Sequence, residues 1–307
     1  MSTTDVPAIR LEGLTKHFGE FVAVDSLTVD IAPGGVIGFL GPNGAGKSTT
    51  IRLLLGLIRP TSGGATVLGS SIRTPTGYMH RVGALIESPA FYPKLSGYDN
   101  LRTLVVLQGL SESRLGPVLE QVGLAGREHD QVGDYSLGMK QRLGIGAALL
   151  RDPDVLMLDE PTNGLDPLGI VEIRELLIRL GAEGKTVLVS SHLLAEIQAA
   201  CDRLIIIKRG QLIFEGKTSD LLAHSKNEVV AVPEHPDDSE RLAKVLKSNG
   251  FDATVDGHSV RVPDQRDAMP VINRKAFEHE ITLRELRADV EDLEDVFLRM
   301  THEERGA

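Results

Sequence analysis

The stretch GPNGAGKST, residues 41–49, carries the residue types that bind a nucleotide phosphate. It matches the pattern G-x-x-x-x-G-K-[ST], follows the apolar run VIGFL and precedes the helical pattern TTIRLLLGLI, a context that argues against a plain glycine turn. Glycines let backbone N–H groups approach phosphate oxygens, and a helix N-terminus adds the positive end of its dipole. Lys47 is expected to reach the terminal phosphates and Ser48 to ligate Mg²⁺. The predicted phosphate-binding residues are Gly41, Pro42, Asn43, Gly44, Ala45, Gly46, Lys47, Ser48 and Thr49.

Polar side chains stand at the ends of two further apolar runs. VLMLDE ends in Asp159 and Glu160, and VLVSSH ends in Ser191 and His192. Ligands of open α/β sheets bind beyond the carboxyl ends of parallel strands, so these groups and the phosphate loop are expected at one edge of a sheet. Hydrolysis of a phosphate bond needs Mg²⁺, a base that deprotonates water, and donors to the γ-phosphate. We assign these roles to Asp159, Glu160 and His192 respectively; each residue alone could instead be a solvated or helix-capping group. Pro161 predicts an extended backbone at Glu160.

A second stretch, GDYSLGMKQRLGIG at residues 133–146, has the features of a phosphate-binding helix start. Ser136 is a favoured helix N-cap, which by itself explains its presence. However, Gly138, Gly144 and Gly146 fall in the first turns of the expected helix, where each glycine costs about 0.8–1.0 kcal/mol relative to alanine. Gly138 would bare backbone N–H groups for an anion, whereas Gly144 and Gly146 would permit close packing. We therefore predict an anion site at Ser136 and Gly138.

The elements that must position these groups follow an α/β pattern. The runs GVIGFLG, DVLMLDE, TVLVSS and RLIIIK are short, apolar and without alternation, which is typical of parallel strands covered on both faces. Between about residues 98 and 151 the apolar spacing is helical, which indicates a helical subdomain inserted in the sheet domain. Asp166 followed by Pro167 predicts the N-terminus of another helix. Residues 1–224 are thus expected to form one domain.

Residues 225–307 predict a second, smaller α+β domain. The order of the apolar patterns is β-α-β-β-α-β, followed by a last helix over EDLEDVFLRMT, and this order resembles a ferredoxin-like module. Pro270 lies within the second helical pattern and interrupts it. The domain carries 12 Lys and Arg against 19 Asp and Glu, a balance of −7 out of the whole chain's −10. This acidic balance argues against binding of nucleic acid.

Composition limits the class of protein further. Of the 307 residues, 41% are hydrophobic and 25% charged, which is typical of globular proteins and excludes the disordered and fibrous classes. The one cysteine, Cys201, excludes an internal disulfide framework and a Cys-rich zinc site. We expect no secretory signal, and the longest apolar runs fall short of the roughly 18–20 residues that span a bilayer. If the protein acts at a membrane, another chain must therefore cross it.

Together these motifs resemble the ATP-binding subunits of ABC transporters. GPNGAGKST is similar to their Walker A motif, VLMLDE to Walker B, NGLD to the D-loop and SSHL to the H-loop. YSLGMKQR is similar to the signature L-S-G-G-Q, with Leu137 in place of one glycine and Met139 in place of the glutamine. The resemblance runs from about Ile9 to Gly216 and implies a P-loop NTPase fold of the ABC type with ATP and Mg²⁺ as cofactors.

The resemblance also assigns roles that the residues alone do not. It implies a head-to-tail homodimer or pseudo-dimer in which Ser136 and Gly138 of one subunit close on ATP held by the other. TKHFG is similar to the segment that stacks on adenine, which suggests Phe18, with Val24 beside it; a core phenylalanine is the alternative for Phe18. Family members generally have a glutamine where this chain has Glu87, a carboxylate that could ligate Mg²⁺ but adds negative charge beside ATP.

Within the family, the chain is most similar to the group of daunorubicin- and bacitracin-resistance exporter ATPases. GALIESPAFYPKLSGYDNL and LEDVFLRMT carry this likeness, which implies a separate membrane permease and a cytoplasmic position at the inner face of the membrane. Phe91, Tyr92 and Tyr98 then suggest the surface that receives the permease, or else pack within their own subdomain. Two alternatives are a soluble ABC ATPase acting on ribosomes or DNA and a P-loop kinase. The single motif set disfavours the first alternative, and YSLGMKQR and His192 disfavour the second.

Overall fold

The computed structural model describes residues 6–87, 90–191, 199–223, 227–263 and 268–290, and also residues 295, 296 and 299. The chain divides into two compact units, Met1–Thr218 and Ser219–Ala307. This division lies slightly before the predicted one at residues 224 and 225. As a result, helix α7 (Thr218–Ala223), which the sequence places in the first domain, falls almost entirely in the second unit.

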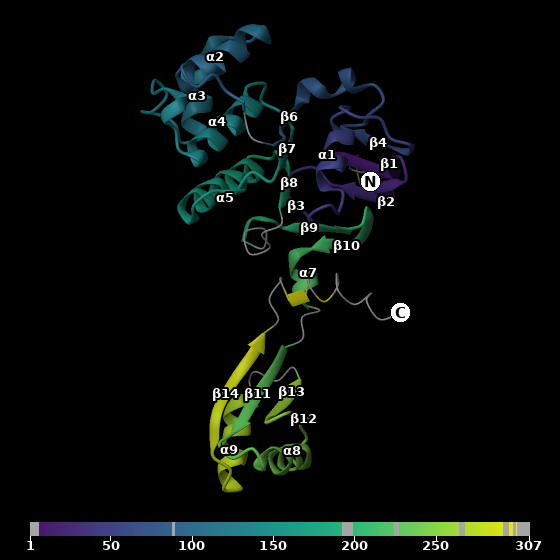
Figure 1. Cartoon of the computed structure of the whole chain (residues 1–307), viewed down its shortest axis with the longest axis vertical. Helices are drawn as coiled ribbons and strands as arrows, with labels where there is room; N and C mark the ends of the chain where they lie inside the picture. Colours follow the sequence, from purple (N-terminus) through teal and green to yellow (C-terminus); the bar gives the residue numbers. More distant parts are fainter. Residues whose placement is uncertain are drawn as a thin grey trace, which may run out of the picture. The chain divides into compact units, whose positions relative to one another are not determined.

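A six-stranded sheet with the order β10-β9-β3-β8-β7-β6 runs through the first unit (Figure 1). All neighbouring strands are parallel except the antiparallel pair β9 and β10, so the prediction of a largely parallel sheet is confirmed. The strands are β3 (Gly35–Leu40), β6 (Val82–Leu85), β7 (Val155–Asp159), β8 (Thr186–Ser191), β9 (Arg203–Lys208) and β10 (Gln211–Lys217). Every residue of β7 and β8 is buried, which explains why these runs lack alternation.

A second sheet, antiparallel and of order β2-β1-β4-β5, was not predicted. It contains β1 (Ile9–Phe18), β2 (Phe21–Ile31), β4 (Ser62–Val67) and the two-residue β5 (Ser70–Ser71). The pairing of β1 with β2 shifts register three times between Leu11 and His17. Each shift moves the apolar side chains to the other face of the strand. The sequence therefore lacks the strict alternation of apolar and polar residues that indicates a half-buried strand.

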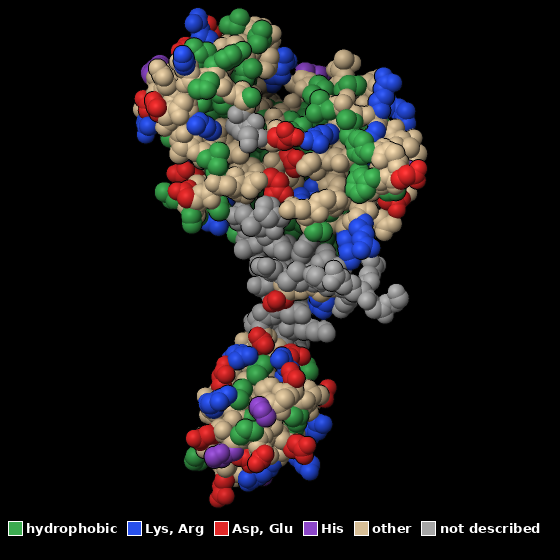
Figure 2. Space-filling view, viewed as in Figure 1, with side chains coloured by type: hydrophobic (Ala, Val, Ile, Leu, Met, Phe, Trp, Pro, Cys, Tyr) green, Lys and Arg blue, Asp and Glu red, His purple; other side chains and the backbone are tan. Residues whose placement is uncertain are grey.

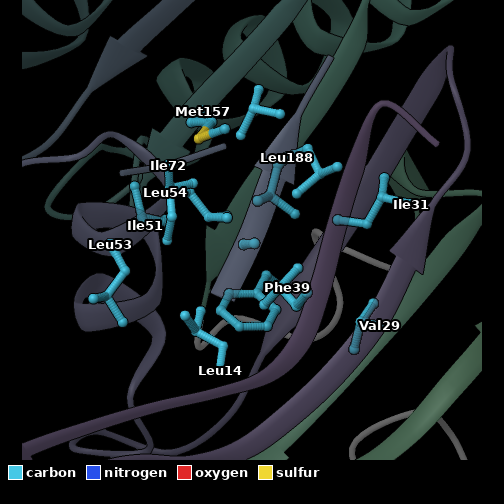
Figure 3. Packing of buried hydrophobic residues seen from close by; sticks show 14 of the residues in the cluster. Leu14, Val29, Ile31, Phe39, Ile51, Leu53, Leu54, Ile72, Met157 and Leu188 are labelled. Atoms are coloured by element: carbon cyan, nitrogen blue, oxygen red, sulfur yellow. The ribbon is translucent and has the colours of Figure 1, made fainter. Parts of the chain in front are cut away.

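The main core lies where these two sheets and helix α1 (Lys47–Leu54) meet. Helix α1 contacts β2, β4 and β7, whereas helix α5 (Pro167–Ala182) contacts β3 and β8. Figure 3 shows Phe39, Leu54 and Leu188 among the side chains that pack together there, and each of them is almost completely buried. The core thus fixes α1, and with it the phosphate loop that precedes α1, against the end of β3.

Helices occupy the stretch between β6 and β7, as the sequence predicts. They are α2 (Gly97–Leu107), α3 (Leu115–Gln121) and α4 (Leu137–Leu149), with short 3₁₀ turns at Glu112–Arg114 and Val132–Asp134. Two more 3₁₀ turns, Pro75–Gly77 and Met79–Arg81, precede β6. A Cβ atom on Gly146 would lie 3.4 Å from Val118 and from Val122, which is an ordinary contact distance. The packing role of Gly146 therefore stays a prediction.

The second unit contains, in chain order, β11 (Asn227–Pro233), α8 (Asp238–Ser248), β12 (Thr254–Asp256), β13 (Ser259–Pro263), α9 (Met269–Glu278) and β14 (Leu283–Val290). This β-α-β-β-α-β order is the predicted one, and the sheet has the antiparallel order β12-β13-β11-β14. Pro270 lies in the first turn of α9 and does not interrupt it, because proline is tolerated where no intrahelical N–H bond is due. The predicted last helix lies mostly outside the described residues.

Charged side chains of both signs are interspersed over the visible face of this unit in Figure 2, with no continuous basic patch there. None of the described helices has both the length and the apolar composition needed to cross a membrane.

Candidate nucleotide-binding site

A hollow of about 400 Å³ lies where the phosphate loop meets the end of β7. Its lining consists of Phe21, Ala23, Asn43, Gly44, Ala45, Gly46, Lys47, Ser48, Thr49, Glu160 and Asn163. Residues 43–49 of the predicted phosphate loop are therefore grouped around one space, together with the predicted base. Gly41 and Pro42 belong to the loop but are not part of this lining.

Two glycines of the loop are required by the surrounding backbone. Gly46 has φ of 108°, and a Cβ atom there would lie 2.3 Å from the carbonyl oxygen of Ala23. A Cβ atom on Gly41 would lie 2.4 Å from the carbonyl oxygen of Ile207. Neither position has room for a side chain, and Gly46 also has a conformation that side chains rarely adopt. In contrast, a Cβ atom on Gly44 would meet nothing within 4 Å, so the loop is open to a ligand at that point.

Lys47, at the start of α1, is almost completely buried, with 6% of its side chain exposed. Its Nζ donates to the carbonyl oxygen of Gly41 at 2.7 Å and lies 3.3 Å from Oε1 of Glu160. A buried ammonium group is stable only when it is paired, and here a carbonyl and a carboxylate pair it. The predicted phosphate ligand and the predicted base are thus in direct contact.

The two acids of VLMLDE are held by a residue that the sequence reasoning missed. Asp159 is the last residue of β7, and its Oδ1 accepts a hydrogen bond from Oγ of Ser190 at 2.5 Å. The backbone N of Glu160 donates to the same Oγ at 2.9 Å and to the carbonyl oxygen of Ser190 at 3.2 Å. The only signal for Ser190 in the sequence is its place one residue before Ser191 in VLVSSH.

Glu160 departs from the extended backbone that Pro161 predicts. Its φ is 49°, in the left-handed region that non-glycine residues rarely occupy. The two hydrogen bonds from its N–H to Ser190 compensate for this unfavourable conformation, so the tertiary structure overrides the local preference. The turn directs the Glu160 side chain, 21% exposed, to the hollow.

The donors predicted for Mg²⁺ agree with the chemistry of that ion. Ser48 lines the hollow, and Asp159 ends the strand next to it, so a hydroxyl and a carboxylate oxygen are both available. Among the residues that the structure describes, no group of three or more His, Cys, Asp or Glu could hold a metal ion. Mg²⁺ does not need such a group, because it is usually held by one or two protein oxygens together with substrate phosphates and water. The third strand-end group, His192, lies outside the described residues.

Glu87, the other predicted Mg²⁺ ligand, is engaged elsewhere. Its carboxylate forms an ion pair with Arg52 of α1, 69% of its side chain is exposed, and it is not part of the hollow's lining. Its φ of 63° is again left-handed. Arg52 follows Ser48 by four residues, so the two side chains share one face of α1. Arg52 therefore neutralises the charge by which Glu87 differs from the usual glutamine.

The two residues predicted to contact adenine, Phe18 and Val24, do not line the hollow. Phe18 is 51% exposed, which excludes the core alternative, but it lies beneath Nζ of Lys16, 4.9 Å from the ring centre, and outside the hollow's lining. Its partner across the hairpin, Phe21, lines the hollow. Val24 is fully buried in the main core, and Ala23 takes its place at the hollow. The lining of the hollow thus includes two residues of the predicted hairpin, Phe21 and Ala23, but neither Phe18 nor Val24.

The signature residues stand at a helix start, as predicted. Ser136 is the N-cap of α4, and its side chain accepts from the N–H of Met139 at 3.2 Å. The Leu137 side chain is 43% exposed and lies against the D-loop, since a Cβ atom on Gly164 would be 3.1 Å from it. Neither Ser136 nor Gly138 belongs to the described lining of the hollow. The same chain therefore does not bring its signature to its own phosphate loop.

The D-loop also has the predicted helix start. Asp166 is the N-cap of α5, its Oδ1 accepts from the N–H of Gly169 at 2.9 Å, and Pro167 occupies the first turn. Asn163, at the other end of this loop, lines the hollow and was not singled out in the sequence.

Comparison with known proteins agrees with this geometry. Residues 24–163 match the family described as ABC transporter. The chain is 40% identical to the uncharacterized ABC transporter ATP-binding protein YhcH of Bacillus subtilis, a match that covers 96% of both proteins. It is 38% identical to the bacitracin transport ATP-binding protein BcrA of Enterococcus faecalis, over 95% of this chain and 96% of that protein.

Solved structures resemble the first unit. One is cbiO1 from Clostridium perfringens, part of the ABC transporter complex cbiONQ, with a TM-score of 0.66 and 28% identity over 71% of this chain and 91% of that one. Another is an ATP-binding cassette solved as a dimer in a post-hydrolysis state with ADP and Pi, with a TM-score of 0.61 and 25% identity over 68% of this chain and 98% of that one. With its phosphate loop, its paired lysine and glutamate and its relatives of nearly equal length, the chain belongs to the ABC transporter ATP-binding proteins and is an ATP hydrolase of that family.

Proposed function

We propose that this chain is the motor subunit of an export transporter that moves an antibiotic or lipid-like compound. The observation that carries the proposal is the grouping of Lys47, Ser48 and Glu160 around one hollow, with Asp159 beside it. The likeness to the bacitracin transport protein over almost the full length of both chains supports the substrate class. Binding and hydrolysis of ATP would supply the free energy for transport by a separate membrane permease.

The roles of the site residues follow from their contacts. Ser48 and Asp159 would hold Mg²⁺, which neutralises phosphate charge when bound. Lys47 would turn from Glu160 to the terminal phosphates, and Glu160 would then accept the proton of the attacking water. His192 is proposed to bond the γ-phosphate, and Phe21, beside Phe18, is proposed to contact the adenine.

A second copy of the chain would complete the ATP site. Ser136 and Gly138 stand at the N-terminus of α4, which attracts anions, yet they do not line the hollow of their own chain. In a head-to-tail dimer they would close on the phosphates held by the partner, with hydrolysis and phosphate release parting the two chains. The dimeric cassette solved with ADP and Pi supports this arrangement.

The loop before α2 is the proposed contact with the permease. The Tyr92 side chain is 65% exposed, and Asn100 holds its backbone by two hydrogen bonds. Oδ1 of Asn100 accepts from the Tyr92 N–H at 2.8 Å, and Nδ2 of Asn100 donates to the Tyr92 carbonyl oxygen at 3.1 Å. Tyr98, in contrast, packs against His129 within the helical segment, 5.6 Å between ring centres. An exposed aromatic on an anchored loop suits a docking site. Contact with the permease would then hold the chain at the inner face of the cell membrane. The second unit, whose strand order supports a ferredoxin-like domain, would act as an accessory domain.

Purification of the tagged chain from membranes of its own organism tests this function. We expect one integral membrane protein to copurify, and Mg²⁺-dependent ATP hydrolysis to rise in its presence. Tyr92→Ala should weaken this association, whereas the matched variant Tyr78→Phe, altered at a fully buried tyrosine, should not. Recovery of ribosomal proteins or DNA in place of a membrane protein would reject the export role.

A further inference from the structure

Ser190 occupies a position between the two acids of the ATP site, and its hydroxyl bonds to both residues. It is fully buried, and its Cα is the register partner of Asp159 in the parallel pair of β7 and β8. The Ser190 hydroxyl donates to Oδ1 of Asp159 at 2.5 Å and accepts from the N–H of Glu160 at 2.9 Å. One oxygen atom therefore holds the proposed Mg²⁺ ligand and the backbone of the proposed base.

The chemistry of a hydroxyl makes this arrangement directional. Serine has one O–H to donate, and here that proton is used on Asp159, which leaves the oxygen to accept from Glu160. Asp159 is 6% exposed, so its carboxylate depends on such a donor to keep one orientation. The same hydroxyl oxygen is one of two acceptors, with the Ser190 carbonyl oxygen, that hold the left-handed backbone of Glu160, whose φ is 49°.

We propose that Ser190 is a positioning residue that couples Mg²⁺ binding at Asp159 to the aim of the base Glu160. The proposal rests on the proposed function of the site. With Oδ1 of Asp159 accepting from Ser190, the other carboxylate oxygen would remain to hold Mg²⁺. Loss of the hydroxyl removes one hydrogen bond from each of the two residues, while the Glu160 N–H keeps its bond to the Ser190 carbonyl oxygen. It therefore weakens the effect of Mg²⁺ on nucleotide binding and slows hydrolysis.

Thr186, at the opposite end of β8, provides a matched control. It is 3% exposed, and its hydroxyl accepts from the N–H of Gly34 at 2.8 Å. Ser190→Ala and Thr186→Val each remove one buried hydroxyl from the same strand, so a general loss of stability affects both variants. Only Ser190 contacts the site.

The test measures binding of a fluorescent ATP analogue to the full chain, once with Mg²⁺ and once with a chelator, together with kcat and KM. We expect Ser190→Ala to reduce the Mg²⁺-dependent gain in affinity by about tenfold, the scale of one hydrogen bond to a charged group, with metal-free affinity unchanged. The kcat of Ser190→Ala should fall by a larger factor than its KM rises. Ser190→Thr should restore the Mg²⁺-dependent gain in affinity, and Thr186→Val should show the affinity and kinetics of the wild type. Melting temperatures of both variants report their folding.

Two results would overturn the inference. One is that Mg²⁺ increases the nucleotide affinity of Ser190→Ala as much as that of the wild type. The other is that Ser190→Ala loses the same amount of nucleotide affinity with and without Mg²⁺. If Ser190→Ala does not fold, Ser190→Cys, which keeps the volume with a weaker donor, must give a Mg²⁺ response below that of the wild type. Failure of the wild type to hydrolyse Mg-ATP would instead reject the proposed function, so the two failures are distinguishable.

Discussion

The ammonium group of Lys47 lies 3.3 Å from the carboxylate of Glu160, so the proposed phosphate-binding cation is paired with the proposed base. In the proposed function, ATP would have to replace this pairing before hydrolysis. The ion pair thus sets two properties of the site, its affinity for nucleotide and the position of its base, and each can be measured.

Glu160→Gln should bind ATP more tightly than the wild type and should not hydrolyse it. Removal of the charge frees Lys47 from a competing carboxylate, and a partly buried charge-assisted bond is worth on the order of 1–2 kcal/mol, or about a tenfold change in affinity. Equilibrium binding and phosphate release check the two parts. Glu172→Gln removes a remote carboxylate paired with Arg142 and serves as the control. Weaker binding by Glu160→Gln would mean that the pair does not compete with ATP.

Gly46→Ala should abolish nucleotide binding. The added Cβ would lie 2.3 Å from the carbonyl oxygen of Ala23, and the residue must also hold φ of 108°, so the phosphate loop has to move. Gly116→Ala makes the same chemical change in α3, where nothing lies within 4 Å of the added atom, and it should leave binding and melting temperature close to the wild type. A Gly46→Ala protein with normal affinity for ATP would contradict the packing described for this loop.

Arg52 and Glu87 should depend on each other. Arg52→Met leaves the Glu87 carboxylate unpaired near the site and should raise KM for Mg-ATP, by at most about fivefold because exposed ion pairs contribute under about 1 kcal/mol. In Glu87→Gln the same arginine change should have no effect, since no charge remains to be neutralised. A double-mutant cycle measures this coupling, with Arg81→Met of the distant pair Arg81–Asp154 as control. Additive effects would show that Arg52 does not act through Glu87.

Alkaline pH should destabilise the chain through two buried groups. Burial, with a smaller effect of Asp202, raises the pKa of Cys201 from 9.0 to about 12, and burial raises the pKa of Tyr78 from 10.0 to about 12. Above pH 9 the unfolded thiol loses its proton while the folded one keeps it, so the free energy of unfolding falls by about 1.4 kcal/mol per pH unit until the folded group also titrates. Urea unfolding at pH 8 and pH 10.5 measures the loss.

Cys201→Ala should show a smaller loss over this range, because the largest titrating contribution is gone. The native thiol should also resist thiol reagents at pH 8 and react only after unfolding, because it is 5% exposed and protonated. Rapid labelling of the native chain would place Cys201 outside the core.

The groups of the site that a local pattern specifies were predictable from the sequence. The phosphate loop lies between a strand and a helix, so its position followed from residues 35–58 alone. Asp159 ends a fully buried strand and Glu160 follows it, and a parallel sheet brings such ends together. Ser136 and Asp166 cap their helices as expected, because N-cap preferences depend on neighbouring residues only.

Contacts between distant segments were not predictable in this way. Phe21, and not Phe18, faces the hollow because of the register of a hairpin whose strands shift three times. Ser190 contacts Glu160, 30 positions away in the sequence, and Arg52 contacts Glu87, 35 positions away. No local sequence pattern describes contacts over such separations. The extended backbone that Pro161 predicts at Glu160 is wrong, because hydrogen bonds to the distant Ser190 hold Glu160 in the left-handed region.

In the proposed head-to-tail dimer, two chains share each ATP. The variant Glu160→Gln allows the most direct measurement of this sharing. Light scattering gives the mass of the protein in solution with saturating Mg-ATP, and the nucleotide bound to it is counted in the same sample. We predict a doubled mass that reverts to the monomer when Gly138→Asp is added, because a carboxylate at the N-terminus of α4 favours the helix but repels a partner's phosphates. A monomeric Glu160→Gln chain that carries bound ATP, both alone and with its permease, would contradict the account.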